Sequence, residues 1–257
     1  MLPSHAVLLF SAAVFAGALN SVAGGGGFIA FPALLFAGIP PINANATNTI
    51  ALWPGTVAAT GAYRRELEGR EKWRPIVPLL VVSLIGALVG AHMLLRTSQA
   101  TFMKVVPWLM LAATLMFTFG GAVTGWMRRR TAEHQHATRA MQLGVIILQL
   151  VVAIYIGYFG AGAGILMLAL LAITGMENIH TMNGFKTLLA STANGVAVVT
   201  FILAKAVAWP QGLLMIFGAV LGGYGGAWFA QKLDPRLIRY LVIAIGAGMS
   251  AYFFWRT

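Results

Sequence analysis

A single lysine, Lys186, lies within a long apolar stretch of this chain, and polar residues recur around it at helical spacing. With about 100° between successive residues, one helical face carries Lys186 together with Asn183, Thr187, Ser191 and Asn194. Amides and hydroxyls donate hydrogen bonds to oxyanions and a lysine adds positive charge, so this face is suited to a small anion. Two other interpretations are open: polar residues that join helices, and a lysine whose charge extends to lipid headgroups.

A second polar face occurs about 137 residues earlier in the chain. Its members are Asn45, Asn48, Thr49, Thr56 and Thr60. Asn45 corresponds to Asn183 and Asn48 to Lys186, so the two faces are copies of one pattern. Related by a twofold axis, they would face one another across a central cavity. Pro54, within the earlier face, predicts a kink that serves either as a hinge or as a bend that fits neighbouring helices.

Glycine runs at 24–27 and 160–164 precede the two polar segments. Glycine lets successive backbone N–H groups point into a concavity, and a helix that begins there adds the positive end of its dipole, so the runs could hold an anion. We therefore add five glycines to the candidate substrate site: Gly25, Gly26, Gly27, Gly162 and Gly164. The alternative is close helix packing, which we favour for Gly86-x-x-x-Gly90 and Gly222-x-x-x-Gly226.

Carboxylates are absent from the interior of the apolar segments, since all but one of the six acidic residues lie in loops and Glu177 ends a short segment. This distribution argues against a cationic substrate and against a carboxylate proton relay. His92 and His180 are candidates for carrying a coupling proton, with a structural role as the alternative. His134 and His136 are spaced H-x-H in a charged loop, and we expect no metal there. No cofactor is predicted.

Ten apolar segments can be drawn, five in each half: 5–22, 27–38, 45–63, 75–95 and 102–123, then 141–158, 161–175, 184–204, 210–230 and 237–255. The second segment of each half is shorter than the roughly 20 residues that cross a bilayer, and it follows a glycine run. We therefore predict eight to ten transmembrane segments, with glycine-broken or re-entrant pairs. The predicted units are a first membrane repeat over 1–125, a basic cytoplasmic linker over 126–140 and a second membrane repeat over 141–257.

Composition places the chain in a membrane, because 59% of its residues are hydrophobic and only 9% are charged. The net charge of +11 could suggest nucleic acid, but the basic residues lie mainly in the short loops 64–74 and 128–139. That pattern predicts two cytoplasmic loops rather than a nucleic-acid surface. The loop 204–210, equivalent to 64–74, carries only Lys205 and should lie outside, so the repeats are inverted and both termini are outside. The fold class is thus an all-α integral membrane protein.

Several strings resemble the sulfite exporter TauE/SafE family, also called TSUP. They are Gly38-Ile-Pro-Pro leading into Asn45-Ala-Thr-Asn, Gly61-Ala-Tyr-Arg-Arg, Trp73-Arg-Pro, and Gly86-Ala-Leu-Val-Gly-Ala. The resemblance covers nearly the whole chain and implies a bacterial inner-membrane permease that exports small sulfur-containing anions such as sulfite, sulfoacetate, other organosulfonates or thiosulfate, with movement coupled to an ion. The chain departs from the family at Asn183-Gly-Phe-Lys, so Lys186 could reflect a particular substrate.

The resulting hypothesis is a secondary anion transporter that works by alternating access. A passive anion channel needs the same lining and a continuous pore. A remote third possibility is an intramembrane hydrolase that pairs Ser191 with His180. The expected partners are the anion, the lipid bilayer and a coupling ion. The sequence leaves the anion, the direction, that ion and any oligomer undetermined.

Overall fold

The computed structural model describes residues 2–22, 25–132, 139–174, 176, 178–230 and 235–256, which form helices and short connections without a strand. The helices of the first half are α1 (Pro3–Val22), α2 (Gly27–Phe36), α3 (Pro41–Ala62), a 3-10 turn η1 (Arg64–Leu67), α4 (Arg70–Trp73), α5 (Ile76–Arg96) and α6 (Gln99–Ala132). Those of the second half are α7 (Arg139–Tyr158), α8 (Ala163–Ile173), α9 (Ile179–Leu203), α10 (Trp209–Ala230) and α11 (Pro235–Arg256). The predicted all-α class is confirmed.

Each predicted apolar segment corresponds to one helix, and the boundaries differ where local signals override hydropathy. α3 begins at Pro41, earlier than expected, because proline has the backbone angle of a helical first turn and needs no donor there. α9 begins at Ile179, because the Asn178 side chain accepts hydrogen bonds from the N–H groups of His180 and Thr181 at 2.8 and 3.3 Å. α6 continues to Ala132, into the stretch assigned to the linker, and 133–138 lie outside the described residues.

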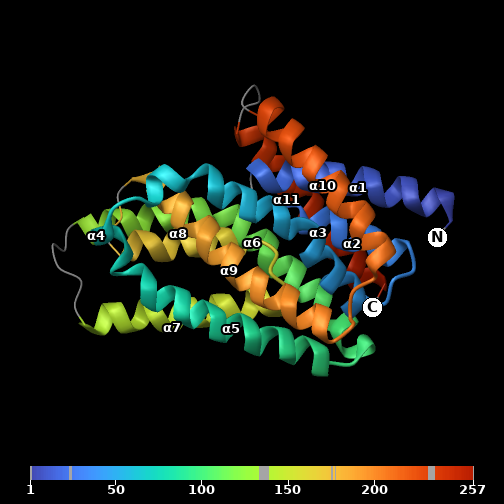
Figure 1. Ribbon diagram of the computed structural model, residues 1–257, viewed down its shortest axis with the longest axis horizontal. Coiled ribbons are helices and arrows are strands. Elements are labelled where there is room, and N and C mark those ends of the chain that lie inside the picture. The colour runs from blue at the N-terminus through green and yellow to red at the C-terminus, as the bar shows by residue number, and fades with distance from the viewer. Residues whose placement is uncertain are drawn as a thin grey trace.

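The helices pack in pairs that join the two halves of the chain (Figure 1). α1 packs on α10, and α5 packs on α7 in the same way. α2 contacts α11 while α8 contacts α6, and α3 lies against α9 in the middle. In the order of the chain, the helices α1, α2, α3, α5 and α6 of the first half are equivalent to α7, α8, α9, α10 and α11 of the second. Under this equivalence, the contact of α1 with α10 matches that of α7 with α5, and the contact of α2 with α11 matches that of α8 with α6.

Glycines allow the outer pairs to approach closely. A Cβ on Gly90 would overlap the Ile154 carbonyl of α7, and one on Gly86 would lie 2.7 Å from Ala153 Cβ. On the other pair, a Cβ on Gly222 would overlap the Val14 carbonyl of α1. Glycine at these positions is therefore a packing requirement, which confirms that interpretation for these three residues.

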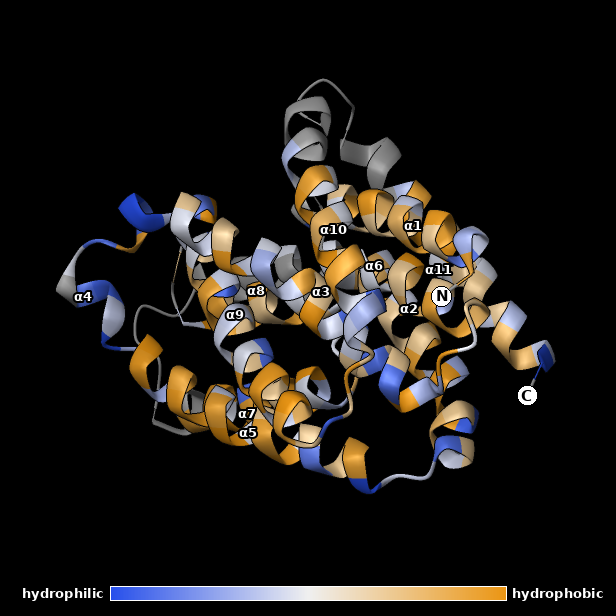
Figure 2. Cartoon of the chain, turned by 45° about the vertical axis from the view of Figure 1, so that its right-hand side comes forward, coloured by the Kyte–Doolittle hydropathy of each residue, from blue (hydrophilic) through white to orange (hydrophobic). Residues whose placement is uncertain are grey.

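The outward surfaces of the paired helices are apolar, as the hydrophobic colours along α1, α5, α7 and α10 show (Figure 2). Four described helical stretches are long and apolar enough to cross a membrane: Pro3–Asn20, Ile76–Arg96, Gln99–Ala122 and Ile179–Leu203. α2 and α8, with 10 and 11 residues, are too short to cross in full. The count of eight to ten crossings remains a prediction.

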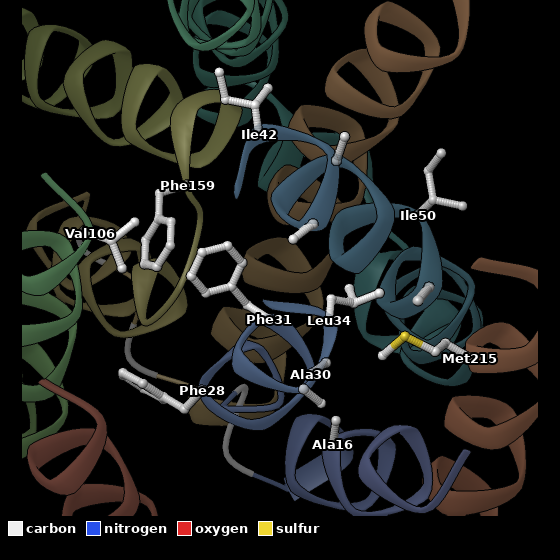
Figure 3. Close-up of a cluster of buried hydrophobic side chains, with 14 of the residues drawn as sticks. Ala16, Phe28, Ala30, Phe31, Leu34, Ile42, Ile50, Val106, Phe159 and Met215 are labelled. Carbon is white, nitrogen blue, oxygen red and sulfur yellow. The ribbon is translucent and has the colours of Figure 1, made fainter. Parts of the chain in front are cut away.

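Short helix α2 lies inside the molecule rather than at its surface (Figure 3). Its Phe31 ring packs edge-on against Phe159 and Phe102, with centroids 5.6 and 6.3 Å apart. Phe28, also on α2, packs against Phe117 of α6 at 5.8 Å. This aromatic core fixes the start of α2 next to the end of α7.

The two ends of the molecule carry different connections (Figure 1). Both chain termini and the connection between α9 and α10 lie toward the right of the view, and α4 lies at the far left. The connection that contains α4 and the connection between α9 and α10, predicted to face opposite sides of a membrane, therefore lie at opposite ends of the long axis.

Candidate functional site

Each polar face meets the glycine start of the short helix in its own half. A Cβ on Gly27, the first residue of α2, would lie 3.6 Å from Asn48 Nδ2 of α3. A Cβ on Gly164, in the first turn of α8, would lie 3.6 Å from Lys186 Cδ of α9. The two contacts involve equivalent residues, so the same local arrangement is built twice. The halves adjoin here, since the position of a Cβ on Gly27 is 3.8 Å from Ala161 Cβ.

The two polar helices touch through residues at equivalent positions. The Trp53 indole of α3 donates from Nε1 to the Ser191 carbonyl of α9 at 2.9 Å. The Trp53 ring also covers Gly195, where an added Cβ would lie 3.2 Å from Cζ2. Contact between equivalent residues is the arrangement expected at a twofold axis. Sequence reasoning missed Trp53, although its equivalence to Ser191 was visible in the register.

Lys186 lies inside the protein, more than a turn from either end of α9. It is half-buried, and its Nζ donates to Asn183 Oδ1 at 2.9 Å. The aliphatic stem of Lys186 runs along Gly164. The ammonium at its end is held by the Asn183 amide, one turn earlier in α9. Lys186 and Asn183, predicted to share a face, are brought together.

Asn48 is 7% exposed, and its Oδ1 has no hydrogen-bond partner. Among the described residues we find no hydrogen bond from its amide, so either amide group can turn toward the glycine of α2. A buried, unpaired amide costs free energy, which makes it a candidate for a bound ligand. The threonine hydroxyls of the two faces are already used: Thr49 donates to Asn45 O at 2.9 Å and Thr187 to Gly184 O at 2.8 Å. Ser191 is half-buried.

Asn45 and Asn194 lie at the other end of the two faces, beside the C-terminus of α7. Asn45 is 1% exposed, its Nδ2 donates to Tyr158 O at 3.0 Å, and its Oδ1 has no partner. The Asn194 Nδ2 donates to Ala190 O at 2.9 Å, and its Oδ1 lies 3.9 Å from the position of a Cβ on Gly160. Each amide thus keeps an Oδ1 without a hydrogen-bond partner among the described residues, while one of its two N–H groups is engaged.

Three of the five candidate glycines are packed against neighbouring helices. A Cβ on Gly25 would lie 2.8 Å from Val242 of α11, and one on Gly26 would overlap the Ala16 carbonyl of α1. Gly162 has φ of +76°, and a Cβ there would lie 3.2 Å from the Ala113 carbonyl oxygen of α6. The N–H groups of the first turn of α2 are also engaged, because Phe28 donates to Gly25 O. The geometry therefore favours packing for these three and leaves Gly27 and Gly164 beside the polar side chains.

The two histidines lie away from these pairs. His92 is exposed on α5, with its Nδ1 2.9 Å from Leu88 O, and His180 is exposed in the first turn of α9. A proton-coupling role for either stays a prediction. Glu177, His134 and His136 lie outside the described residues. Across the part of the chain that is described, no group of three or more His, Asp or Glu side chains could hold a metal ion.

The hydrolase alternative is not compatible with the helix. His180 and Ser191 belong to one continuous helix, α9. Eleven residues at about 1.5 Å per residue separate them by roughly 16 Å along its axis, far beyond hydrogen-bond reach. No Ser–His pair can form between them, so this possibility is withdrawn.

Comparison with known proteins covers almost the whole chain. The profile of the family described as "Sulfite exporter TauE/SafE" matches residues 9–253, which confirms the resemblance. A "Probable membrane transporter protein ORF9" from Sinorhizobium sp is 30% identical over 94% of this chain and 89% of its own length. The "Probable membrane transporter protein YfcA" of Escherichia coli strain K12 is 29% identical over 95% and 87%, and a "Probable membrane transporter protein" of Haemophilus influenzae is 28% identical over 95% and 92%. No solved structure matches the chain significantly. With the apolar helices, these relatives identify a multi-pass membrane protein.

Proposed function

We propose that this chain, which belongs to the sulfite exporter TauE/SafE family, is a secondary transporter that moves a small sulfur-containing anion across the bacterial inner membrane by alternating access. Candidate substrates are sulfite, sulfoacetate, another organosulfonate or thiosulfate, and the proposed direction is export. The relatives bear the name of membrane transporters, whereas the substrate, the membrane and the direction belong to the proposal.

The observation that carries the proposal is the doubled arrangement of a polar side chain against a glycine helix start. Lys186 lies on Gly164, and Asn48 lies on Gly27. A helix start carries positive potential, and Lys186 adds a full charge. Among the described residues, no carboxylate forms a hydrogen bond or ion pair with Lys186 or Asn48; Glu66 contacts α9 at Thr181, five residues before Lys186. Asn183 holds the ammonium of Lys186 and can be replaced by an oxyanion when substrate binds.

Alternating access is supported by the pairing of helices between the halves. Exchanging the two halves preserves the contacts of α1 with α10 and α5 with α7, and equivalent residues meet where Trp53 contacts Ser191. Inverted repeats with a site at their interface are a common plan of secondary transporters, in which one repeat rocks against the other. We therefore infer two inverted-topology repeats, one on each side of the 126–140 stretch.

The experiment is uptake of radiolabelled sulfite, sulfoacetate and thiosulfate into proteoliposomes. Transport should saturate with concentration, whereas a passive channel would give electrogenic flux that does not saturate. Lys186→Ala should lower kcat/KM for the transported anion by roughly 10- to 100-fold, because a hydrogen bond to a charged group contributes about 1.5–3 kcal/mol. Lys186→Arg keeps the charge and should retain more transport.

Lys104→Ala is the matched control, since Lys104 is exposed near the start of α6. It should leave transport of the same anion unchanged. If no sulfur anion is transported by the unaltered protein, or if Lys186→Ala equals the control, the proposed function is wrong.

A further inference from the structure

Helix α7 ends in a turn that leaves a main-chain oxygen without its helical hydrogen-bond donor. Gly160, with φ of +83°, donates its N–H to Tyr155 O at 3.0 Å, so Ile156 O lacks the donor that a continuing helix would supply. Ile156 O and Asn194 Oδ1 lie 3.1 and 3.9 Å from the position of a Cβ on Gly160. The space left by this glycine is therefore bordered by one main-chain oxygen and one amide oxygen.

The orientation of the two amides that border this turn is fixed by their own hydrogen bonds. Asn45 donates to Tyr158 O, and Asn194 donates to Ala190 O. Reversing either amide would place an oxygen against a carbonyl oxygen, so Oδ1 of each is the free atom. Asn45 Oδ1 is fully buried and has no partner among the described residues. A buried acceptor without a donor is costly and suits a bound cation.

We propose that Asn45, Asn194 and the C-terminal carbonyls of α7 form a binding site for a small monovalent cation, with Na⁺ as the ion of this class. Hard cations prefer oxygen ligands, and the negative end of a helix dipole attracts positive charge. In transporters with broken helices, the C-terminal ends of half-helices and unwound carbonyls coordinate Na⁺. The role of the ion in coupling rests on the proposed function, and its binding does not.

The cation site adjoins the anion cluster at Asn48, which follows Asn45 by three residues on α3, but it lies away from the lysine. Lys186 precedes Asn194 by eight residues on α9, about 12 Å along the axis, which limits repulsion between the ammonium and the cation. The ligands of the site are neutral, so its affinity is expected to be modest and to increase when the anion is bound. The same oxygens would repel an oxyanion, and Asn45 and Asn194 are accordingly removed from the anion-binding group. The lack of interior carboxylates argued against a cationic substrate, whereas this cation is a companion of the anion.

The test measures the melting temperature of the purified full chain in NaCl, KCl and choline chloride at equal ionic strength and pH, without any anionic substrate. A ligand that binds only the folded protein raises its melting temperature. Na⁺ should raise it relative to choline in the unaltered protein. Asn194→Leu should raise the Na⁺ concentration for the half-maximal shift by about tenfold or more. Thr192→Val, two residues away on α9 with its hydroxyl bonded to Leu188 O, should keep the shift.

Asn194→Asp provides a second variant if the leucine variant fails to fold. It keeps an oxygen and adds a charge, so it should lower the Na⁺ concentration needed. A protein without a Na⁺-specific shift, an Asn194→Leu variant that keeps it, or an Asn194→Asp variant that loses it would each overturn the site. If the unaltered protein shows the Na⁺ shift but transports no sulfur anion, the proposed function is wrong and the cation site stands.

Discussion

Asn48 and Lys186 stand at equivalent positions in the two halves, yet only one of them is charged. The two sides of the proposed anion site are therefore unequal, with a neutral amide beside the start of α2 and a lysine, whose stem lies against Gly164, beside the start of α8. A small oxyanion between them would be attracted mainly toward α8 and would be oriented by the amide. The charge at each position should then control transport more than side-chain size does.

This asymmetry gives a prediction for Asn48. Asn48→Asp should reduce transport of the sulfur anion more strongly than Asn48→Ala, because a carboxylate beside the helix start repels the anion while alanine only removes the amide. The measurement is the initial rate of radiolabelled uptake into proteoliposomes at matched protein content. Lys104→Ala, at an exposed position near the start of α6, is again the control. Equal rates for the Asp and Ala variants would remove Asn48 from the anion site.

Helices α5 and α7 pack closely, and the end of α7 leads directly to the start of α8. The two helices can approach this closely because Gly90 of α5 has no side chain where the Ile154 main chain of α7 passes. A side chain at this position must displace backbone, which cannot move out of the way as a flexible side chain can.

Gly90→Ala should therefore lower the stability of the protein by about 1–3 kcal/mol, the usual cost of overpacking. Gly144→Ala on α7 is the matched control, because an added Cβ there meets nothing within 4 Å. Alanine has the higher helix propensity, so the control should be neutral or slightly stabilising. Thermal unfolding in detergent measures both. A Gly90→Ala variant as stable as the control would show that the close approach is not required.

The whole molecule has the pairing expected of two halves related by a twofold axis, and its connections divide between two ends (Figure 1). The chain has no cysteine, so a single cysteine can be introduced for labelling without first removing native ones. Glu68 and Ala204 are exposed in the two equivalent connections.

Glu68→Cys should react with a membrane-impermeant maleimide only from the cytoplasmic side, and Ala204→Cys only from the outside. The expectation follows from the basic residues around Glu68 and their scarcity around Ala204. Labelling in intact spheroplasts and in inverted vesicles measures the two sides, and the cysteine-free parent gives the background. Reaction of both cysteines from one side would exclude inverted repeats.

Much of the fold was predictable because hydrophobic period and length depend on local sequence. The ten apolar segments correspond to helices, and the short second segments are α2 and α8. The boundaries failed at α3 and α9, where Pro41 and the Asn178 cap extend a helix into polar sequence. The connection after α3 contains η1 and α4, which the hydropathy pattern does not indicate.

Sequence alone identified a membrane protein and predicted two similar halves with a polar face in each, because repetition and hydropathy are properties of residue order. Only the tertiary structure decided which atoms of those faces are free. Asn183 accepts a hydrogen bond from Lys186, while Asn45 donates one N–H to Tyr158 O and its Oδ1 has no partner. The residue order places an oxygen and an NH₂ group of each asparagine on the helical face, but it does not show which of them is engaged; for Asn45 the partner, Tyr158, comes from a distant helix. That choice separates the residues proposed to hold an anion from those proposed to hold a cation.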